Sequence, residues 1–149
     1  WVAGLPSWPW REVAAVAGMG KLAQNLFISM STMAQYAALA GFAPGTREIL
    51  EERRDIFRQR RDFLLPAVQS LGFDVPCRPD GAFYIYADAS RFTHDSQQFC
   101  LQLLEEHGVA LTPGVDFGHH RANEHLRFSY TTSMERLEVA VERLSRVLG

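Results

Sequence analysis

The sequence predicts an α+β fold in which helices pack on one small sheet. Between about Trp10 and Leu71, apolar residues recur at helical spacing, and after Gly72 the period shortens to that of strands. Helical spacing returns near Asp95 and again after Ser133. Helices and strands are thus largely segregated, which is typical of α+β domains. A length of 149 residues suits one such domain with a packed core.

Two helices are expected in the first part of the chain. One is expected from about Trp10 to Ile28, where Ala, Val, Leu and Met stand three or four residues apart. The stretch ISMSTMAQ interrupts this pattern, because Ser29, Ser31 and Thr32 supply capping groups. A second helix, TMAQYAALAGF, is then expected to end near Gly41.

The longest predicted helix runs from Thr46 to about Leu71. Thr46 is expected to be its N-cap and Gly72 its C-cap. Pro66 lies inside the apolar stripe and is expected to kink or split the helix, because proline lacks the backbone N–H.

Two short strands are expected next, at Phe73–Val75 and Ala82–Ala87, around a turn built on Pro79, Asp80 and Gly81. Gly81 is interpreted either as a residue needed for positive φ or close backbone approach, or simply as part of a tight turn.

A helix is expected from about Asp95 to His107, with Asp95 and Gln98 in capping-box register and Gly108 as its stop. The segments VALTPG and LRFSYTT read as strands. The last helix is expected from about Ser133 to Leu148, beginning with a capping box of Thr132 and Glu135.

Composition argues against several classes of partner. The net charge of −2 gives no indication of nucleic acid or an anionic membrane surface. No stretch approaches the roughly 18 apolar residues of a membrane span. The two cysteines, Cys77 and Cys100, match no metal-site spacing and suit a reducing cytosol, so a cytoplasmic location is expected. The start WVAGLPSWPW carries three tryptophans, which suggests a segment cut from a longer chain or a surface that packs against something else.

Arg127 is the residue most suggestive of chemistry. Strand alternation places Arg127 and Ser129 on the face opposite Leu126, Phe128 and Tyr130. A charge in an apolar strand needs a partner, and the planar guanidinium fits a carboxylate with two hydrogen bonds. From the residues alone, that carboxylate belongs either to an acidic side chain of the chain or to a ligand.

Other candidates are weaker. The loop TPGVDFG is either a ligand-contacting loop or an ordinary connector. The three histidines His119, His120 and His125, with Asp116, do not form a convincing ligand set, so no metal site is predicted. Lys21, the only lysine, is either a catalytic amine or a solvated helix residue.

Five motifs in order resemble a known family. They are QNLFISMSTMAQYAAL, ERRDIFRQRRDFLLPAVQSLG, RPDGAFYIYAD, LTPGVDFG and LRFSYTTSMERLEVAVERL. Together they cover roughly residues 18 to 149 and resemble the C-terminal part of class I/II aminotransferases, which are fold type I enzymes that use pyridoxal phosphate. The resemblance is greatest to the aspartate aminotransferase-like branch. It implies connecting helices over residues 1–45 and the aminotransferase small domain over residues 46–149.

The resemblance also implies roles for individual residues. Arg127 would bind the substrate α-carboxylate. The turn Gly81, Ala82 and Phe83 would approach the substrate pocket. The loop with Pro113, Gly114, Phe117 and Gly118 would border its entrance, and the segment from Asn25 through Ser29 to Gln35 would join the two domains near a dimer interface.

The family implies a homodimer that moves an amino group between an amino acid and a 2-oxo acid. The family's Schiff-base lysine, however, has no counterpart in this chain, since Lys21 lies in the stretch that resembles a connecting helix. The chain alone is therefore expected to be inactive. The alternative is a stand-alone, non-catalytic binding or dimerisation module derived from that domain.

Overall fold

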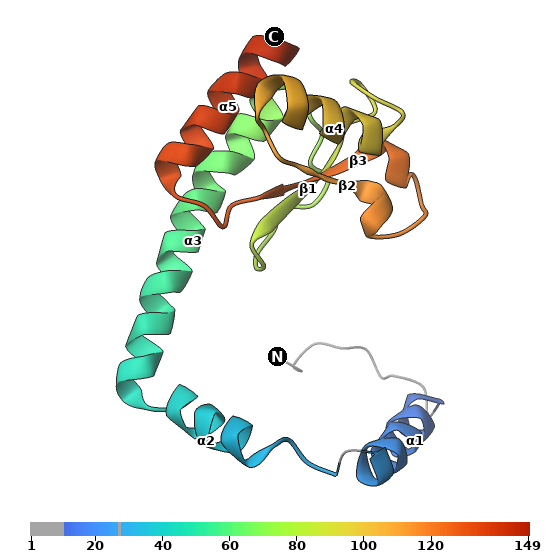
Figure 1. The fold of residues 1–149 in the computed structure, drawn as a ribbon, viewed down its shortest axis with the longest axis vertical. Helices are drawn as coiled ribbons and strands as arrows, with labels where there is room; N and C mark the ends of the chain where they lie inside the picture. Colours follow the sequence, from blue (N-terminus) through green and yellow to red (C-terminus); the bar gives the residue numbers. More distant parts are fainter. Residues whose placement is uncertain (1–10, 27) are drawn as a thin grey trace. The chain divides into compact units, whose positions relative to one another are not determined.

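The computed structural model describes residues 11–26 and 28–149 (Figure 1). The tryptophan-rich start, residues 1–10, lies outside the described residues, and so does the surface proposed for it. The chain divides into two compact units, of which the first ends at Ile49 and the second is Leu50–Gly149. Each unit is described here by itself.

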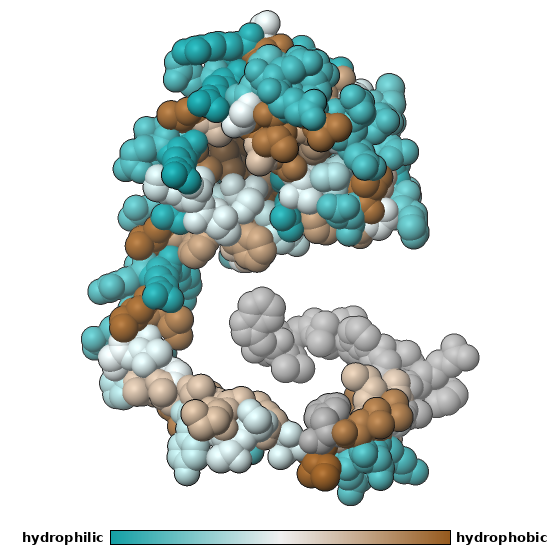
Figure 2. Space-filling view, in the orientation of Figure 1, coloured by the Kyte–Doolittle hydropathy of each residue, from teal (hydrophilic) through white to brown (hydrophobic). Residues whose placement is uncertain are grey.

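The first unit consists of helices with exposed apolar side chains. Helix α1 is Arg11–Leu26 and α2 is Thr32–Gly41. The predicted first helix was two residues too long, because Ile28 has a left-handed φ of 61°. Ser31 caps α2 as expected, accepting a hydrogen bond from the Ala34 N–H at 3.3 Å. Helix α2 has no buried residue, and Figure 2 shows apolar side chains gathered on α1.

Helix α3 is Pro44–Ser70 and runs from the first unit into the second. It begins two residues before the predicted cap at Thr46, because proline is well tolerated in a first helical turn. The prediction that Pro66 could split the helix is wrong, because α3 continues through this residue as a single helix. Pro66 and Asp62, whose carbonyl loses its partner, are both exposed, so water can satisfy that carbonyl.

Gly72 ends α3 as predicted. Its φ is 99°, its N–H donates to Gln69 O at 3.0 Å, and the Phe73 N–H donates to Val68 O at 3.3 Å. This pair of bonds is a Schellman motif, which satisfies carbonyls that the helix end would leave unpaired. The helix is anchored just before this point, because Leu64 and Val68 are buried.

The second unit contains an antiparallel sheet with the strand order β1-β3-β2. Strand β1 is Tyr84–Asp88, β2 is Thr112–Pro113 and β3 is His125–Ser129. Arg127 lies in the central strand, opposite Tyr86 on one side and Thr112 on the other.

The strands differ in extent from the prediction. Residues 73–75 form only one bridge, Asp74 to Asp88, instead of a strand. Strand β1 starts two residues late because Ala82 has a left-handed φ of 62°, which extended structure excludes. Of VALTPG, only Thr112–Pro113 is strand.

Helices α4, Ser96–His107, and α5, Met134–Leu148, complete the second unit. Asp95 caps α4, accepting from the Gln98 N–H at 3.0 Å, and Gly108 ends it at a φ of 64°, as predicted. The N-cap of α5 is Ser133, not Thr132, and no side-chain cap bond forms there.

One face of the sheet is buried by three helices, which confirms the α+β fold. The core combines the inward side chains of β1 and β3 with residues of α3, α4 and α5; among them are Leu64, Val68, Ile85, Ala87, Leu103, Leu126, Phe128, Leu137 and Leu144. The opposite face carries Tyr84, Tyr86, Arg127 and Ser129, and stays partly open. Within the described residues, no helix is both long and apolar enough to cross a bilayer.

Candidate functional site

Arg127 is held on the open face of the sheet. Its Nη2 donates to Thr112 Oγ1 at 3.0 Å, across the β2–β3 pairing. Its Nε is buried and has no hydrogen-bond partner among the residues that the structure describes. A buried donor without a partner is costly, which makes this guanidinium a group poised to donate to an acceptor.

Three aromatic rings surround this guanidinium. Its Cζ lies 4.9 Å from the ring centre of Phe117, 5.7 Å from that of Tyr84 and 6.0 Å from that of Phe83. Cation–π contacts of this kind position a charge without neutralising it. The rings come from the turn before β1, from β1 itself and from the loop after β2, so the tertiary fold brings them together.

The sequence left open a structural ion pair for Arg127. The ion pairs among the described side chains all involve residues other than Arg127. No described acidic side chain places an oxygen within 4.0 Å of the Arg127 nitrogens. The arrangement therefore matches a receptor for an external carboxylate better than an internal salt bridge.

A cavity of about 430 Å³ borders this site. It is lined by Tyr84, Tyr86, Phe117, Gly118, His119 and His120. Tyr84 and Phe117 also flank the guanidinium, so the cavity lies next to Arg127. Burial raises the pKa of Tyr86 above its usual value, because desolvation disfavours the charged phenolate.

The sequence analysis did not select Tyr84, Tyr86 or Thr112. Alternation alone could have placed the two tyrosines on one face of β1. That this face is the face of Arg127 depends on the register Tyr86 to Arg127, which joins residues far apart in the chain.

Gly114 packs closely against the residues beside the candidate site. It is buried, and a Cβ there would lie 2.8 Å from both His125 O and the Tyr86 hydroxyl, and would also collide with Ala122 O. Only glycine allows this close approach of the loop to the sheet. The atoms that surround Gly114 thus belong to the protein itself. The preceding residue, Pro113, is part of β2.

The three residues of the turn 81–83 have different neighbours: Gly81 and Ala82 contact Tyr130, whereas Phe83 contacts Arg127. Gly81 has open space around its Cα hydrogens and no left-handed φ, so neither special reason predicted for this glycine holds. The left-handed residue is its neighbour Ala82. The carbonyls of Gly81 and Ala82 accept from the Tyr130 hydroxyl at 3.4 and 3.3 Å, and only Phe83 approaches Arg127.

The histidines separate in the structure. His119 and His120 line the cavity, whereas His125 stacks on Tyr86 at 5.0 Å, with Nδ1 2.9 Å from Arg121 O. No cluster of three or more potential metal ligands occurs in the part of the chain that the structure describes.

Lys21 is exposed on α1, and its carbonyl accepts a hydrogen bond from the Asn25 side chain at 2.6 Å. Helix α1 belongs to the first unit, whereas Arg127 and its rings belong to the second. Lysine is thus not among the residues that the second unit gathers around the guanidinium.

Comparison with known proteins gives a consistent result. Residues 3–144 match the family described as aminotransferase class I and II. The aspartate/prephenate aminotransferase of Thermus thermophilus is 39% identical over 136 residues, which cover 90% of this chain and 34% of that protein. The valine–pyruvate aminotransferase of Mycobacterium tuberculosis is 35% identical over 123 residues, covering 83% of this chain and 32% of that protein.

Solved structures show the same relation. An aminotransferase from Mycobacterium tuberculosis superposes with a TM-score of 0.79 at 34% sequence identity, over 89% of this chain and 34% of that chain. The chain spans about a third of the length of the relatives it matches. The family match over nearly all its residues and the shared fold lead to one conclusion: the chain belongs to the class I and II aminotransferases.

Proposed function

We propose that this chain is the C-terminal portion of a pyridoxal phosphate-dependent aminotransferase, with the small domain over residues 46–149. In this proposal, Arg127 binds the α-carboxylate of an amino acid and of the 2-oxo acid that exchanges with it. The observation that carries the proposal is the buried Arg127 Nε, which has no hydrogen-bond partner among the described residues.

Arg127 would act by orientation. Two parallel hydrogen bonds from the guanidinium would fix the plane of a carboxylate, and with it the direction of the Cα–H bond that must break. The Thr112 hydroxyl and the Phe117 ring hold the guanidinium in place for this role. The rings of Phe83, Tyr84 and Phe117 would also keep water from the bound carboxylate, which strengthens its hydrogen bonds.

The cofactor would be held elsewhere. Bound pyridoxal phosphate supplies an electron sink for the Cα carbanion. The residues around Arg127 include no amine and fit a carboxylate rather than this cofactor, and Lys21 lies in the stretch that resembles a connecting helix of the family. We therefore place the Schiff-base lysine outside this chain and expect residues 1–149 alone to be inactive.

The remaining assignments follow from the same proposal. Homodimers are expected, as the sequence resemblance implies. The free thiols of Cys77 and Cys100 support a location in the reducing cytoplasm.

The test is transamination by the complete protein that carries this chain, supplied with pyridoxal phosphate and a panel of amino and 2-oxo acids. Arg127→Lys should lower kcat/KM by about 10- to 100-fold, because lysine keeps the charge but loses the planar fork. The matched control is Arg143→Lys, since the hydrogen bonds of Arg143 to described residues go to the His107 and Gly108 carbonyls at the end of α4. Equal effects of the two changes would make Arg127 structural.

Absence of transamination by the wild-type complete protein would instead favour the stand-alone binding or dimerisation module. In that event, light scattering should show whether the chain assembles.

A further inference from the structure

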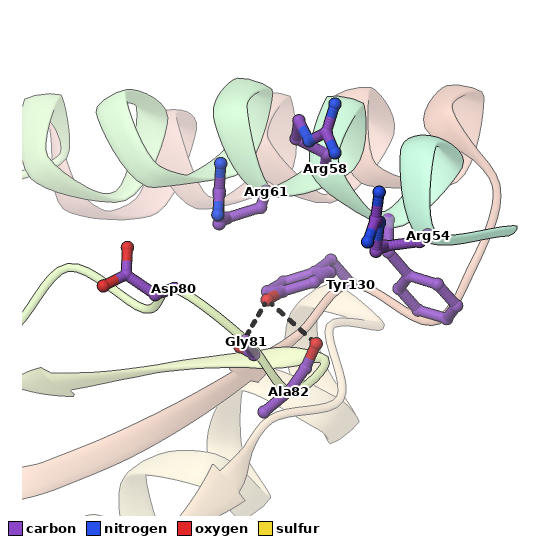
Figure 3. Close-up of a pocket in the computed structure, with 8 residues that line it drawn as sticks. Arg54, Arg58, Arg61, Asp80, Gly81, Ala82 and Tyr130 are labelled. Carbon is purple, nitrogen blue, oxygen red and sulfur yellow. Dashed lines mark hydrogen bonds between the residues drawn. The ribbon is translucent and has the colours of Figure 1, made fainter. Parts of the chain in front are cut away.

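A second cavity, of about 330 Å³, lies between α3 and the turn that precedes β1 (Figure 3). All of its lining residues belong to the second unit: Arg54, Phe57, Arg58, Arg61, Asp80, Gly81, Ala82 and Tyr130. Its volume falls in the range of small-molecule sites. The carboxylate site proposed for Arg127 does not use its arginines.

Three arginines give this cavity its character. Arg54, Arg58 and Arg61 follow one another at four- and three-residue spacing, so they lie along one face of α3 (Figure 3). Along the helix axis their Cα atoms are about 6 and 4.5 Å apart. Asp80 is the one acidic side chain in the lining, and outside it Glu51, Asp55 and Asp62 each pair with one of the three arginines.

One arginine is fixed and two can adjust. The Arg61 side chain is only 14% exposed, and its Nη1 donates to Pro79 O at 3.2 Å while Nε and Nη2 contact Asp62. Arg54 and Arg58 instead form exposed pairs with Glu51 and Asp55, one helical turn away. Such exposed pairs contribute little free energy, so either guanidinium can exchange its partner for a ligand oxygen.

Two aromatic rings also line the cavity, that of Phe57 on α3 between the arginines and that of Tyr130 beside the turn. Phe57 and Tyr130 pack edge to face with ring centres 6.1 Å apart. The Tyr130 hydroxyl donates to the carbonyls of Gly81 and Ala82, which holds the turn in place beneath the arginines (Figure 3). An apolar wall beside three guanidiniums strengthens their attraction for an anion relative to open water.

We propose that this cavity binds a small dianion, of the size of a phosphate monoester or a dicarboxylate. Arg61 would give a fixed anchor for one oxyanion group, and Arg54 and Arg58 would close on the remaining oxygens. Arginine forks suit both carboxylate and phosphate oxygens, so this chemistry is shared by the two ligand classes.

The experiment is isothermal titration of the complete protein with inorganic phosphate and, separately, with succinate, at low ionic strength. At least one probe should bind saturably, and Arg58→Gln should weaken that binding at least about tenfold, since it removes a charge-assisted pair of hydrogen bonds. Arg58 is exposed, so the substitution should leave folding intact.

Two controls separate this site from others. Arg53→Gln removes the same charge from an exposed position of α3 outside the lining and should change binding less than about twofold. Titration is repeated in Arg127→Lys, which weakens carboxylate binding at the proposed substrate site, so that the saturable binding remaining there belongs to this cavity and the test stays independent of the proposed function. Phosphate binding alone would identify a phosphate ester site, succinate binding alone a dicarboxylate site, and binding of both a general dianion site.

The proposal is overturned if neither probe binds saturably. It is also overturned if Arg58→Gln leaves binding intact, if Arg53→Gln weakens it equally, or if the binding disappears in Arg127→Lys.

Discussion

The Arg127 Cζ atom lies 4.9 Å from the centre of the Phe117 ring, closer than to either of its two other aromatic neighbours. The two residues come from β3 and from the loop after β2. Their contact couples the position of that loop to the direction of the guanidinium. A change in the loop should therefore alter how Arg127 binds a ligand, and a change in Arg127 should alter the position of the loop.

Phe117→Leu should raise KM for the amino acid substrate of the complete enzyme by about 3- to 10-fold. Leucine keeps apolar bulk but loses the cation–π contact, which contributes about 0.5–2 kcal/mol in partly desolvated sites. Steady-state kinetics check this. Val115→Ala, two residues away on the same loop, should change KM less than about twofold; a comparable rise in both variants would deny Phe117 a specific role.

Gly114→Ala should destabilise the protein by about 1–3 kcal/mol, because the new methyl group meets backbone oxygens that cannot move aside cheaply. Urea unfolding of the complete protein measures the change. Gly118→Ala is the control, since its Cβ would enter open space. If the two substitutions lower the free energy of unfolding equally, the close approach at Gly114 is not what fixes the loop.

The two cysteines should differ sharply toward a thiol reagent. Burial, aided by the charge of Asp116, raises the pKa of Cys100 to about 11, so its reactive thiolate is scarce at about pH 8. Cys77 is exposed. Mass spectrometry after brief alkylation should find Cys77 modified and Cys100 intact, with Cys100 reacting only after denaturation. Modification of Cys100 at the rate of Cys77 would show that the core around α4 opens readily.

Asp88 should make stability sensitive to acid. Hydrogen bonds from Ser90 and the charge of Arg121, 2.8 Å away, hold the pKa of this carboxyl below its ordinary value of 3.8. A lowered folded-state pKa stabilises the fold above the unfolded-state pKa, and this contribution is lost as pH falls through the folded-state pKa.

Asp88→Asn should therefore lower the melting temperature near neutral pH and make less difference below about pH 4. Thermal unfolding across this range tests the sign. Asp74→Asn, at an exposed position, serves as the matched change. A deficit of Asp88→Asn that is independent of pH would mean that packing, not charge, links Asp88 to Arg121.

Local patterns predicted the ends of several helices correctly. Asp95, Gly72 and Gly108 act at the ends for which they were selected, and Ser31, one of three candidate capping residues, caps α2. A cap is decided by hydrogen bonds among residues a few positions apart, so the sequence carries the necessary information. Alternation likewise placed Arg127 and Ser129 opposite the buried Leu126, Phe128 and Tyr130.

The failures have longer-range causes. Pro66 was expected to kink or split α3, yet the helix is not split, because Leu64 and Val68 are packed in the core on either side of it. Of the two interpretations left open for Gly81, the plain turn agrees with the structure, and the left-handed residue is its neighbour Ala82. Which of two neighbours takes such a conformation depends on contacts made elsewhere, here those of Tyr130 with the turn.

The sequence by itself determined the α+β composition, most helix ends and the strand face on which Arg127 lies, because these depend on periodicity and on chemistry within a few residues. Only the tertiary structure decided that Phe83, Tyr84 and Phe117 surround that arginine, and that Arg54, Arg58 and Arg61 face the Gly81–Ala82 turn. Both arrangements rest on strand register and on the packing of α3 against the sheet. Those are set by burial of apolar surface between segments distant in the chain, which no local pattern records.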